Sequence, residues 1–351
     1  MRTWRQRVGY GAVMCVLLAC NPAGGGQEAG GGGGGVGGAD GITPDSFAGC
    51  VPGSPPETLL TGLNCSYGMS GLAVKDGYVY FNLDGVLSRI PRGGGAVQPV
   101  MPHVADHVDA APYLLISRFN QDPACELCSD IVLYDAVSDD EQVIATGLRN
   151  VAHLARTDAA IYVGHGVEQP DGSWLRVLDR FADGSTVRLP VDAANLHGIA
   201  ASNEALFFVS WDPMSQWRLR RLDLASMQVG DVAESWKSSA VLVHDELVYW
   251  TAPDRTLARV SVTGGQPESM GDAAARGFAS SEEGLVYLVD TNDFFEGRIA
   301  SSEANGSVAT LVEAGPSPSL AVDDSCVYYV EVGVDCEFAE IERASLMRAP
   351  R

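Results

Sequence analysis

Three histidines are the side chains whose types and spacing most favour chemistry. His103, His153 and His197 each lie nine or ten residues before an aromatic residue in a similar sequence pattern. Neutral imidazole is a common metal ligand, so equivalent places in repeated units would bring these rings together. We therefore expect a divalent-metal or polyanion site, with Arg156 and Arg276 as charge partners. The alternative is three histidines that are solvated or hydrogen-bonded at a rim, with no cofactor required.

The cysteines form a second group that can do chemistry. An even number of cysteines in an exported chain predicts disulfides. Local pairing is the simplest arrangement, 50–65, 125–128 and 326–336, although other pairings stay open. The 125–128 pair is also a CxxC, for which redox or metal chemistry is the alternative; Asp122 and Asp130 flank it and disfavour a thiolate. The six cysteines are Cys50, Cys65, Cys125, Cys128, Cys326 and Cys336.

A repeat over residues 57–351 must position all of these side chains. Its unit reads apolar-Ala-Val, an acidic turn, then an apolar and two aromatic residues, as in 72–81 and 320–329. An acidic or amide residue lies four positions before each aromatic anchor, where we expect it to bond the backbone of a tight turn. The anchors, 33 to 49 residues apart, are Tyr80, Tyr113, Tyr162, Phe207, Tyr249, Tyr287 and Tyr328.

Each unit continues with a third strand, a Gly-rich or Asn-Gly turn and a short fourth strand. Four antiparallel strands every ~40–50 residues are typical of a β-propeller. The sequence predicts an all-β fold of seven four-stranded blades. Its last unit ends after a third strand, and residues 57–62 read as the missing fourth, so we expect the N-terminal strand to close the last blade. A six-bladed ring with a degenerate insert is the alternative, because Pro112 interrupts the second unit.

These units resemble the repeats of YWTD- and NHL-type propellers and of related secreted bacterial lipoproteins. Val248-Tyr249-Trp250-Thr251 matches most of the YWTD motif, and Ala252 replaces its Asp. That family usually has six blades, so the resemblance implies a propeller without implying a ligand. No nucleophile elbow, phosphate loop or dinucleotide fingerprint accompanies the repeat.

The N-terminus predicts export and a lipid anchor. Three arginines precede the apolar run 8–18, and Leu17-Leu18-Ala19-Cys20 resembles the lipobox of bacterial lipoproteins. We expect residues 1–19 to be a signal peptide and Cys20 to carry the only membrane anchor; an ordinary signal peptide is the alternative. Residues 20–56 form a Gly-rich tether with a reach of ~30 Å. Asn at position 21 favours the outer membrane by analogy with enteric sorting.

The charge balance disfavours two classes of partner. The chain carries 45 acidic and 23 basic residues, a net charge of −22, which disfavours nucleic acid and anionic lipid. We therefore expect a monomeric, non-catalytic binding or scaffold lipoprotein of the cell envelope, whose partner is an envelope protein or a carbohydrate. Two alternatives remain: a lyase or hydrolase acting on carbohydrate or a small molecule at the channel mouth, and a structural or adhesion protein.

Overall fold

The computed structural model describes residues 49–63, 71–110, 113–122, 125, 127–193, 196–211, 216–236, 240–271, 275–281, 284–290, 297–302, 308–314, 319–332 and 344–351. The signal peptide, Cys20, the tether before residue 49, Cys65 and Cys336 lie outside these ranges. The strands belong to one compact unit, Pro44–Arg351. Within the described ranges, no helix has the length and hydropathy needed to cross a membrane.

Five sheets of four antiparallel strands account for most of this unit. The first contains β2 (Leu72–Lys75), β3 (Tyr78–Leu83), β4 (Val86–Pro91) and β5 (Gln98–Pro102). The second contains β13 (Leu196–Ala201), β14 (Ala205–Trp211), β15 (Trp217–Asp223) and β16 (Val229–Glu234). The third contains β17 (Val241–His244), β18 (Leu247–Thr251), β19 (Leu257–Ser261) and β20 (Glu268–Ser269). The fourth contains β21 (Ala275–Ser281), β22 (Gly284–Asp290), β23 (Gly297–Ser302) and β24 (Val308–Ala314). The fifth contains β25 (Leu320–Val322), β26 (Cys326–Val332), β27 (Ala344–Pro350) and β1 (Glu57–Leu63).

The sixth sheet has seven strands and is continuous through β9. The first part of β9 pairs with β8 and the second part with β10, and Arg149 takes part in both ladders. Gly147 and Asn150 have positive φ values, 69° and 51°, next to that shared residue, so the strand bends there. The strands are β6 (Val104–Ala110), β7 (Tyr113–Phe119), β8 (Cys128–Asp135), β9 (Asp140–Arg156), β10 (Ile161–Glu168), β11 (Trp174–Ala182) and β12 (Ser185–Arg188).

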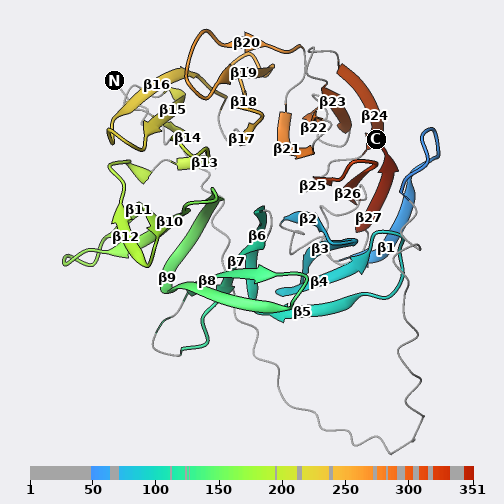
Figure 1. Ribbon diagram of the computed structural model, residues 1–351, viewed down its shortest axis with the longest axis horizontal. Helices are drawn as coiled ribbons and strands as arrows, with labels where there is room; N and C mark the ends of the chain where they lie inside the picture. Colours follow the sequence, from blue (N-terminus) through green and yellow to red (C-terminus); the bar gives the residue numbers. More distant parts are fainter. Residues whose placement is uncertain are drawn as a thin grey trace, which may run out of the picture. The chain divides into compact units, whose positions relative to one another are not determined.

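The innermost strands follow one another around a common centre (Figure 1). Strand β2 contacts β6, and the contacts continue through β9, β13, β17, β21 and β25 back to β2. With every described element a strand and the sheets set around this centre, the protein has a β-propeller fold, as the sequence predicted.

Each hydrophobic cluster lies between two neighbouring groups of strands. Most of the aromatic anchors are buried there, including Tyr80, Tyr287 and Tyr328, each 0% exposed. One cluster joins the two halves of the seven-stranded sheet, where Leu115 of β7 packs near Ile161 of β10. The anchors at these positions therefore pack between neighbouring sheets.

The turn chemistry differs from the sequence prediction by one residue. At three hairpins the side chain five positions before the anchor accepts hydrogen bonds from backbone amides of the turn, at 2.8–3.3 Å. These side chains are Thr157, Ser202 and Asp323. The residue four positions before takes a left-handed backbone at Asp76 and Asp245, with φ values of 50° and 49°. Aspartate tolerates that conformation better than most residues, which explains its recurrence there.

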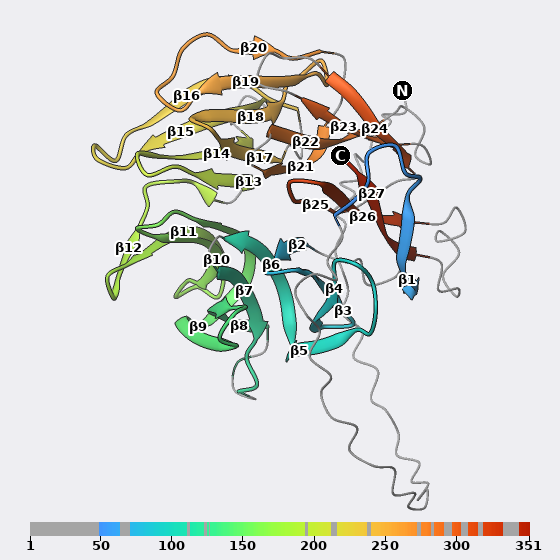
Figure 2. The same ribbon diagram turned by 45° about the vertical axis from the view of Figure 1, so that its right-hand side comes forward.

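The last sheet closes on the N-terminal strand. Strand β1 pairs antiparallel with β27, from Glu57 opposite Arg348 to Leu63 opposite Ala344; Figure 2 shows β1 in blue beside β27 in red. The predicted pairing of the N-terminal strand with the last strand of the chain is therefore present, and it covers the edge that β27 would otherwise expose.

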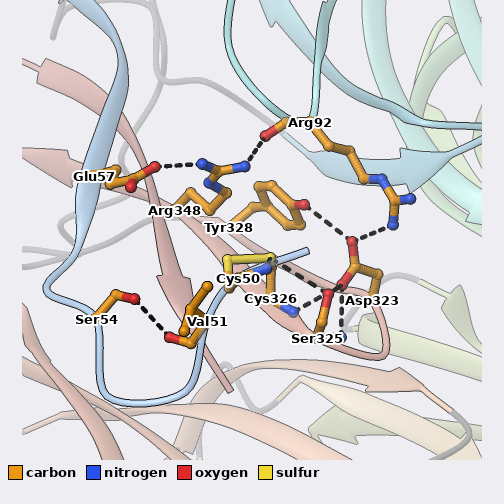
Figure 3. Close-up of a disulfide and its surroundings, with 10 residues drawn as sticks. All are labelled: Cys50, Val51, Ser54, Glu57, Arg92, Asp323, Ser325, Cys326, Tyr328 and Arg348. Carbon is orange, nitrogen blue, oxygen red and sulfur yellow. Dashed lines mark hydrogen bonds and ion pairs between the residues drawn. A yellow bond between two sulfur atoms is a disulfide. The ribbon is translucent and has the colours of Figure 1, made fainter. Parts of the chain in front are cut away.

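A disulfide reinforces this closure and corrects the predicted pairing. Cys50 bonds to Cys326 (Figure 3), across a sequence separation of 276 residues. Local pairing of 50–65 and 326–336 is therefore wrong. It fails because β1 returns to the end of the chain and brings Cys50 beside the start of β26. The remaining pair, Cys125 with Cys128, is bonded as expected.

Polar contacts join the first and last sheets at the same place. The Arg92 guanidinium, just after β4, donates to Asp323 at 2.6 Å, and the Tyr328 hydroxyl donates to the same oxygen at 3.0 Å. Arg348 donates to the Arg92 carbonyl at 2.7 Å and pairs with Glu57 (Figure 3). Burial acts to raise the pKa of Asp323, but the hydrogen bonds it accepts outweigh burial and lower that pKa.

Candidate functional site

A central cavity of about 640 Å³ lies among the innermost strands. Its described lining consists of small and aliphatic residues, one phenylalanine and two serines, with Arg156 as the single charged side chain. Cavities of this size and apolar character can hold a drug-sized ligand. The side chains of Asp106–Ala110 on β6, and that of Arg276 on β21, lie outside the described part of the structure.

The structure places the three predicted histidines in different environments. His153 on β9 directly precedes the lining residue Leu154, and His197 on β13 lies two residues before the lining residue Ile199, so both lie at one end of the cavity. They interact electrostatically with one another. His103 is exposed in the turn between β5 and β6, with a left-handed φ of 62°. Among the described residues, no group of three or more histidine, cysteine or carboxylate side chains is arranged to hold a metal ion.

His153 is fixed by the neighbouring sheet. Its Nε2 lies 3.0 Å from the Leu196 carbonyl, and Gly164 opposite it leaves the space that the ring occupies. A Cβ at Gly164 would come within 3.2 Å of the ring. Burial lowers the pKa of His153 to about 4, despite the bond to Leu196, and Arg176 and His197 add to that lowering. The ring is therefore neutral at neutral pH.

This environment predicts a pH-dependent loss of stability. The unfolded chain protonates His153 near pH 6.5, whereas the folded protein does so only near pH 4. Unfolding therefore takes up a proton between these values, and stability should fall by on the order of 2 kcal/mol as pH drops through them. In His153→Gln this component should vanish, so urea titrations at pH 7 and pH 4.5 should differ less than in the parent. An equal difference in both proteins would contradict this.

Sequence reasoning missed a group of tryptophans on one face. Of six tryptophans, four lie between positions 174 and 236. Trp174 begins β11, Trp211 ends β14, Trp217 begins β15 and Trp236 follows β16. In antiparallel sheets these ends lie on the side where the innermost strands begin, which we call the mouth face. The sequence feature that could have indicated this group is the position of the tryptophans next to loops, where an indole side chain is difficult to bury fully.

Six residues of this face form a connected group, the tryptophan–arginine cluster. The Arg149 guanidinium lies 5.2 Å from the centre of the Trp174 ring. Arg149 and Arg176 are both register partners of Gly166, whose missing side chain leaves room for the Trp174 ring. On the next sheet the His197 and Trp217 rings meet at 4.3 Å, and the Trp211 and Trp217 rings at 4.9 Å. The members are Arg149, Trp174, Arg176, His197, Trp211 and Trp217.

The cluster is exposed and carries positive charge. Trp174 is 46% exposed and Trp211 39%. Burial lowers the pKa of His197, and Arg176 lowers it further, so Arg176 acts on rings of both sheets. Glu168 lies 3.8 Å from Arg149 and offsets part of its charge. Arg176 makes no ion pair with any described residue, although the protein as a whole is strongly acidic.

A fourth histidine belongs to the interior. His165 lies 2.9 Å from Asp179, which also accepts from Arg188 at 3.0 Å. His165 and Asp179 are each 5% exposed. Burial acts to raise the pKa of Asp179, and the hydrogen bonds from Arg188 and His165 outweigh it and lower that pKa. Their mutual hydrogen bonds satisfy these groups within β10–β12, so we assign them a structural role.

Comparison with solved structures shows the fold alone. A chain of the mitotic checkpoint complex aligns with a TM-score of 0.59 and 12% identity, covering 84% of this chain and 94% of that one. A puromycin-hydrolysing peptidase of Mycobacterium tuberculosis aligns with a TM-score of 0.59 and 15% identity over 86% of this chain. A prolyl endopeptidase aligns with a TM-score of 0.54 and 9% identity over 81%. The protein spans about half of each peptidase, 55% and 50%. No family model and no curated protein matches the sequence.

Proposed function

We propose that this protein is a non-catalytic binding propeller, held at the bacterial cell envelope by a lipid on Cys20. The observation that carries the proposal is the contrast between its cavity and its mouth face. The described cavity wall holds one charged side chain, Arg156, too few groups to share acid, base and nucleophile roles. The mouth face exposes indole rings beside arginines, the side chains most enriched where proteins bind partners.

We also propose that the ring has seven blades, with β9 serving in two of them. Its two ladders meet at Arg149, and the hydrophobic cluster between β7–β8 and β10 matches those between the other sheets. If β7, β8 and β10 lay flat in one continuous sheet, their side chains could not pack face to face in this way, because hydrogen-bonded strands lie edge to edge. The cycle of innermost strands supports the same count.

The likeness to peptidases does not carry a peptidase activity to this chain. At 15% and 9% identity it is a likeness of fold, and one fold hosts many unrelated functions. A hydrolase or lyase with a site at the channel mouth stays the second candidate from the sequence. It would require reactive side chains on the undescribed part of the wall.

The proposal is tested by localisation and capture in one experiment. The full-length protein and a Cys20→Ser variant are expressed in the same bacterial host, and membranes are separated from the soluble fraction. We expect the parent in the membrane fraction and the variant in the soluble one. Chemical crosslinking of intact cells should then yield one dominant envelope component bound to the parent. Recovery of the parent in the soluble fraction, or turnover of a sugar by the purified protein, would contradict the proposal.

A further inference from the structure

We infer that the tryptophan–arginine cluster binds an acidic glycan, one whose sugar rings carry carboxylate groups. The inference rests on the proposed binding function and names its ligand class. Three features of the cluster carry it: exposed indoles, two arginines on the strands that flank β10, and the contrast between local and overall charge.

The indole rings supply broad flat surfaces for stacking. Trp211 and Trp217 meet edge to face, with an interplanar angle of 89°, and Trp211 stays 39% exposed, so an indole surface is open to a ligand there. Aromatic faces of this kind bury large apolar area at low entropic cost. A pyranose ring has an apolar face of similar width, whereas its hydroxyl groups stay at the edge. An exposed indole therefore fits a sugar ring better than it fits a hydrophobic side chain, which requires an enclosed pocket.

The arginines supply the charge preference. A guanidinium binds a carboxylate through two parallel hydrogen bonds, and Arg176 is exposed and makes no ion pair within the described residues. Arg149 already lies over Trp174, which keeps its charge beside a stacking surface. Because the rest of the protein is acidic, an anion is attracted to this cluster and not to the surface around it. The indole rings beside the arginines then favour an anion that also carries a ring.

Gly166 makes room for the Trp174 ring beside the arginines. Gly166 faces Arg149 and Arg176 across the sheet, and a Cβ there would come within 3.2 Å of the Trp174 ring. Gly164 and Gly166 of β10 thus leave the room that the His153 and Trp174 rings take, and the Trp174 ring lies beside Arg149. An indole beside a guanidinium group matches one acidic sugar in a chain of rings. A protein partner would need a broader face, of ~800 Å² on each side for a standard interface.

The test measures binding of oligogalacturonate to the purified full-length protein by calorimetry, with a neutral oligogalactan of the same length beside it. The acidic oligomer should bind, and more weakly as salt rises. Trp174→Ala, Trp211→Ala and Arg176→Gln should each weaken binding at least about tenfold. Two variants outside the cluster are the matched controls: Phe119→Ala, an equally exposed aromatic at 40%, and Lys75→Gln, a removed charge. Both should stay within about twofold of the parent.

The outcomes distinguish the acidic-glycan assignment from the more general proposal of a binding propeller. Equal binding of both oligomers, or binding that Arg176→Gln leaves unchanged, overturns the acidic-glycan assignment. Failure to bind any glycan, with a crosslinked envelope protein that is lost in Trp174→Ala, overturns the glycan and leaves the binding propeller standing. No glycan and no crosslinked component would overturn both. Melting curves of every variant are recorded first, so that a loss of binding in a folded variant is distinguished from unfolding.

Discussion

Replacing Leu59, Leu60 and Leu63 by serine is expected to lower the free energy of unfolding by about 5 kcal/mol. Leu63 is 2% exposed, and the other two leucines are partly buried against the same cluster. Burying one leucine fully contributes ~1.5–3 kcal/mol and partial burial proportionately less, and the loss of β1 would also expose the hydrogen-bonding edge of β27. Domains have only ~5–15 kcal/mol in total, so this variant should lie near the limit of folding.

Thermal melting and size-exclusion chromatography measure this effect. The variant should melt at least about 10 °C below the parent and form aggregates through the free edge. Val187→Ser and Val229→Ser are the controls, because these valines also lie on outermost strands but are 39% and 40% exposed. They should change stability by less than about 0.5 kcal/mol. A triple variant that melts with the controls would show that the ring closes without β1.

The repeat could be predicted from the sequence because it obeys local rules. Strand periodicity, paired aromatics and hairpin turns recur along the chain, and each depends on neighbours a few residues away. The pairing of residues 57–62 with the last strand followed from counting strands in the final unit. Even there, the detail of the turns was missed by one position. Asp, Ser and Thr side chains bond amides two and three residues ahead, and a recurring acidic residue beside them was taken for the bonding group.

Features that depend on ring closure could not be predicted in this way. Cys50 and Cys326 are distant in sequence and lie together only because β1 returns to β27. The continuity of β9 depends on Gly147 and Asn150 taking left-handed conformations within a strand. The spacing of the histidines predicted equivalent places in the repeat, but His103 lies in a turn, and whether a ring points into the cavity or against Leu196 depends on the register of the next sheet. The tryptophan–arginine cluster similarly combines residues from five strands.

Removing the Cys50–Cys326 bond by the double substitution Cys50→Ala and Cys326→Ala should cost ~2–5 kcal/mol. In the chain-entropy account a disulfide restricts the unfolded chain, and the restriction grows with the length of the closed loop. The separation of 276 residues places this bond at the upper end of that range. It also fixes the segment before β1, next to the contacts of Arg92, Asp323 and Arg348 that join the first and last sheets (Figure 3).

The pair Cys125→Ala and Cys128→Ala provides a control matched in chemistry and burial. Cys128 and Cys326 are both 1% exposed, but the control bond spans a separation of 3 residues. Its loss should therefore cost about 2 kcal/mol or less by the same account. Urea unfolding of the oxidised proteins gives both values, after peptide mapping without reductant has verified each bond. Equal losses in the two double variants would mean that restriction of the long loop contributes nothing, and that the strand pairing of β1 with β27 carries the closure by itself.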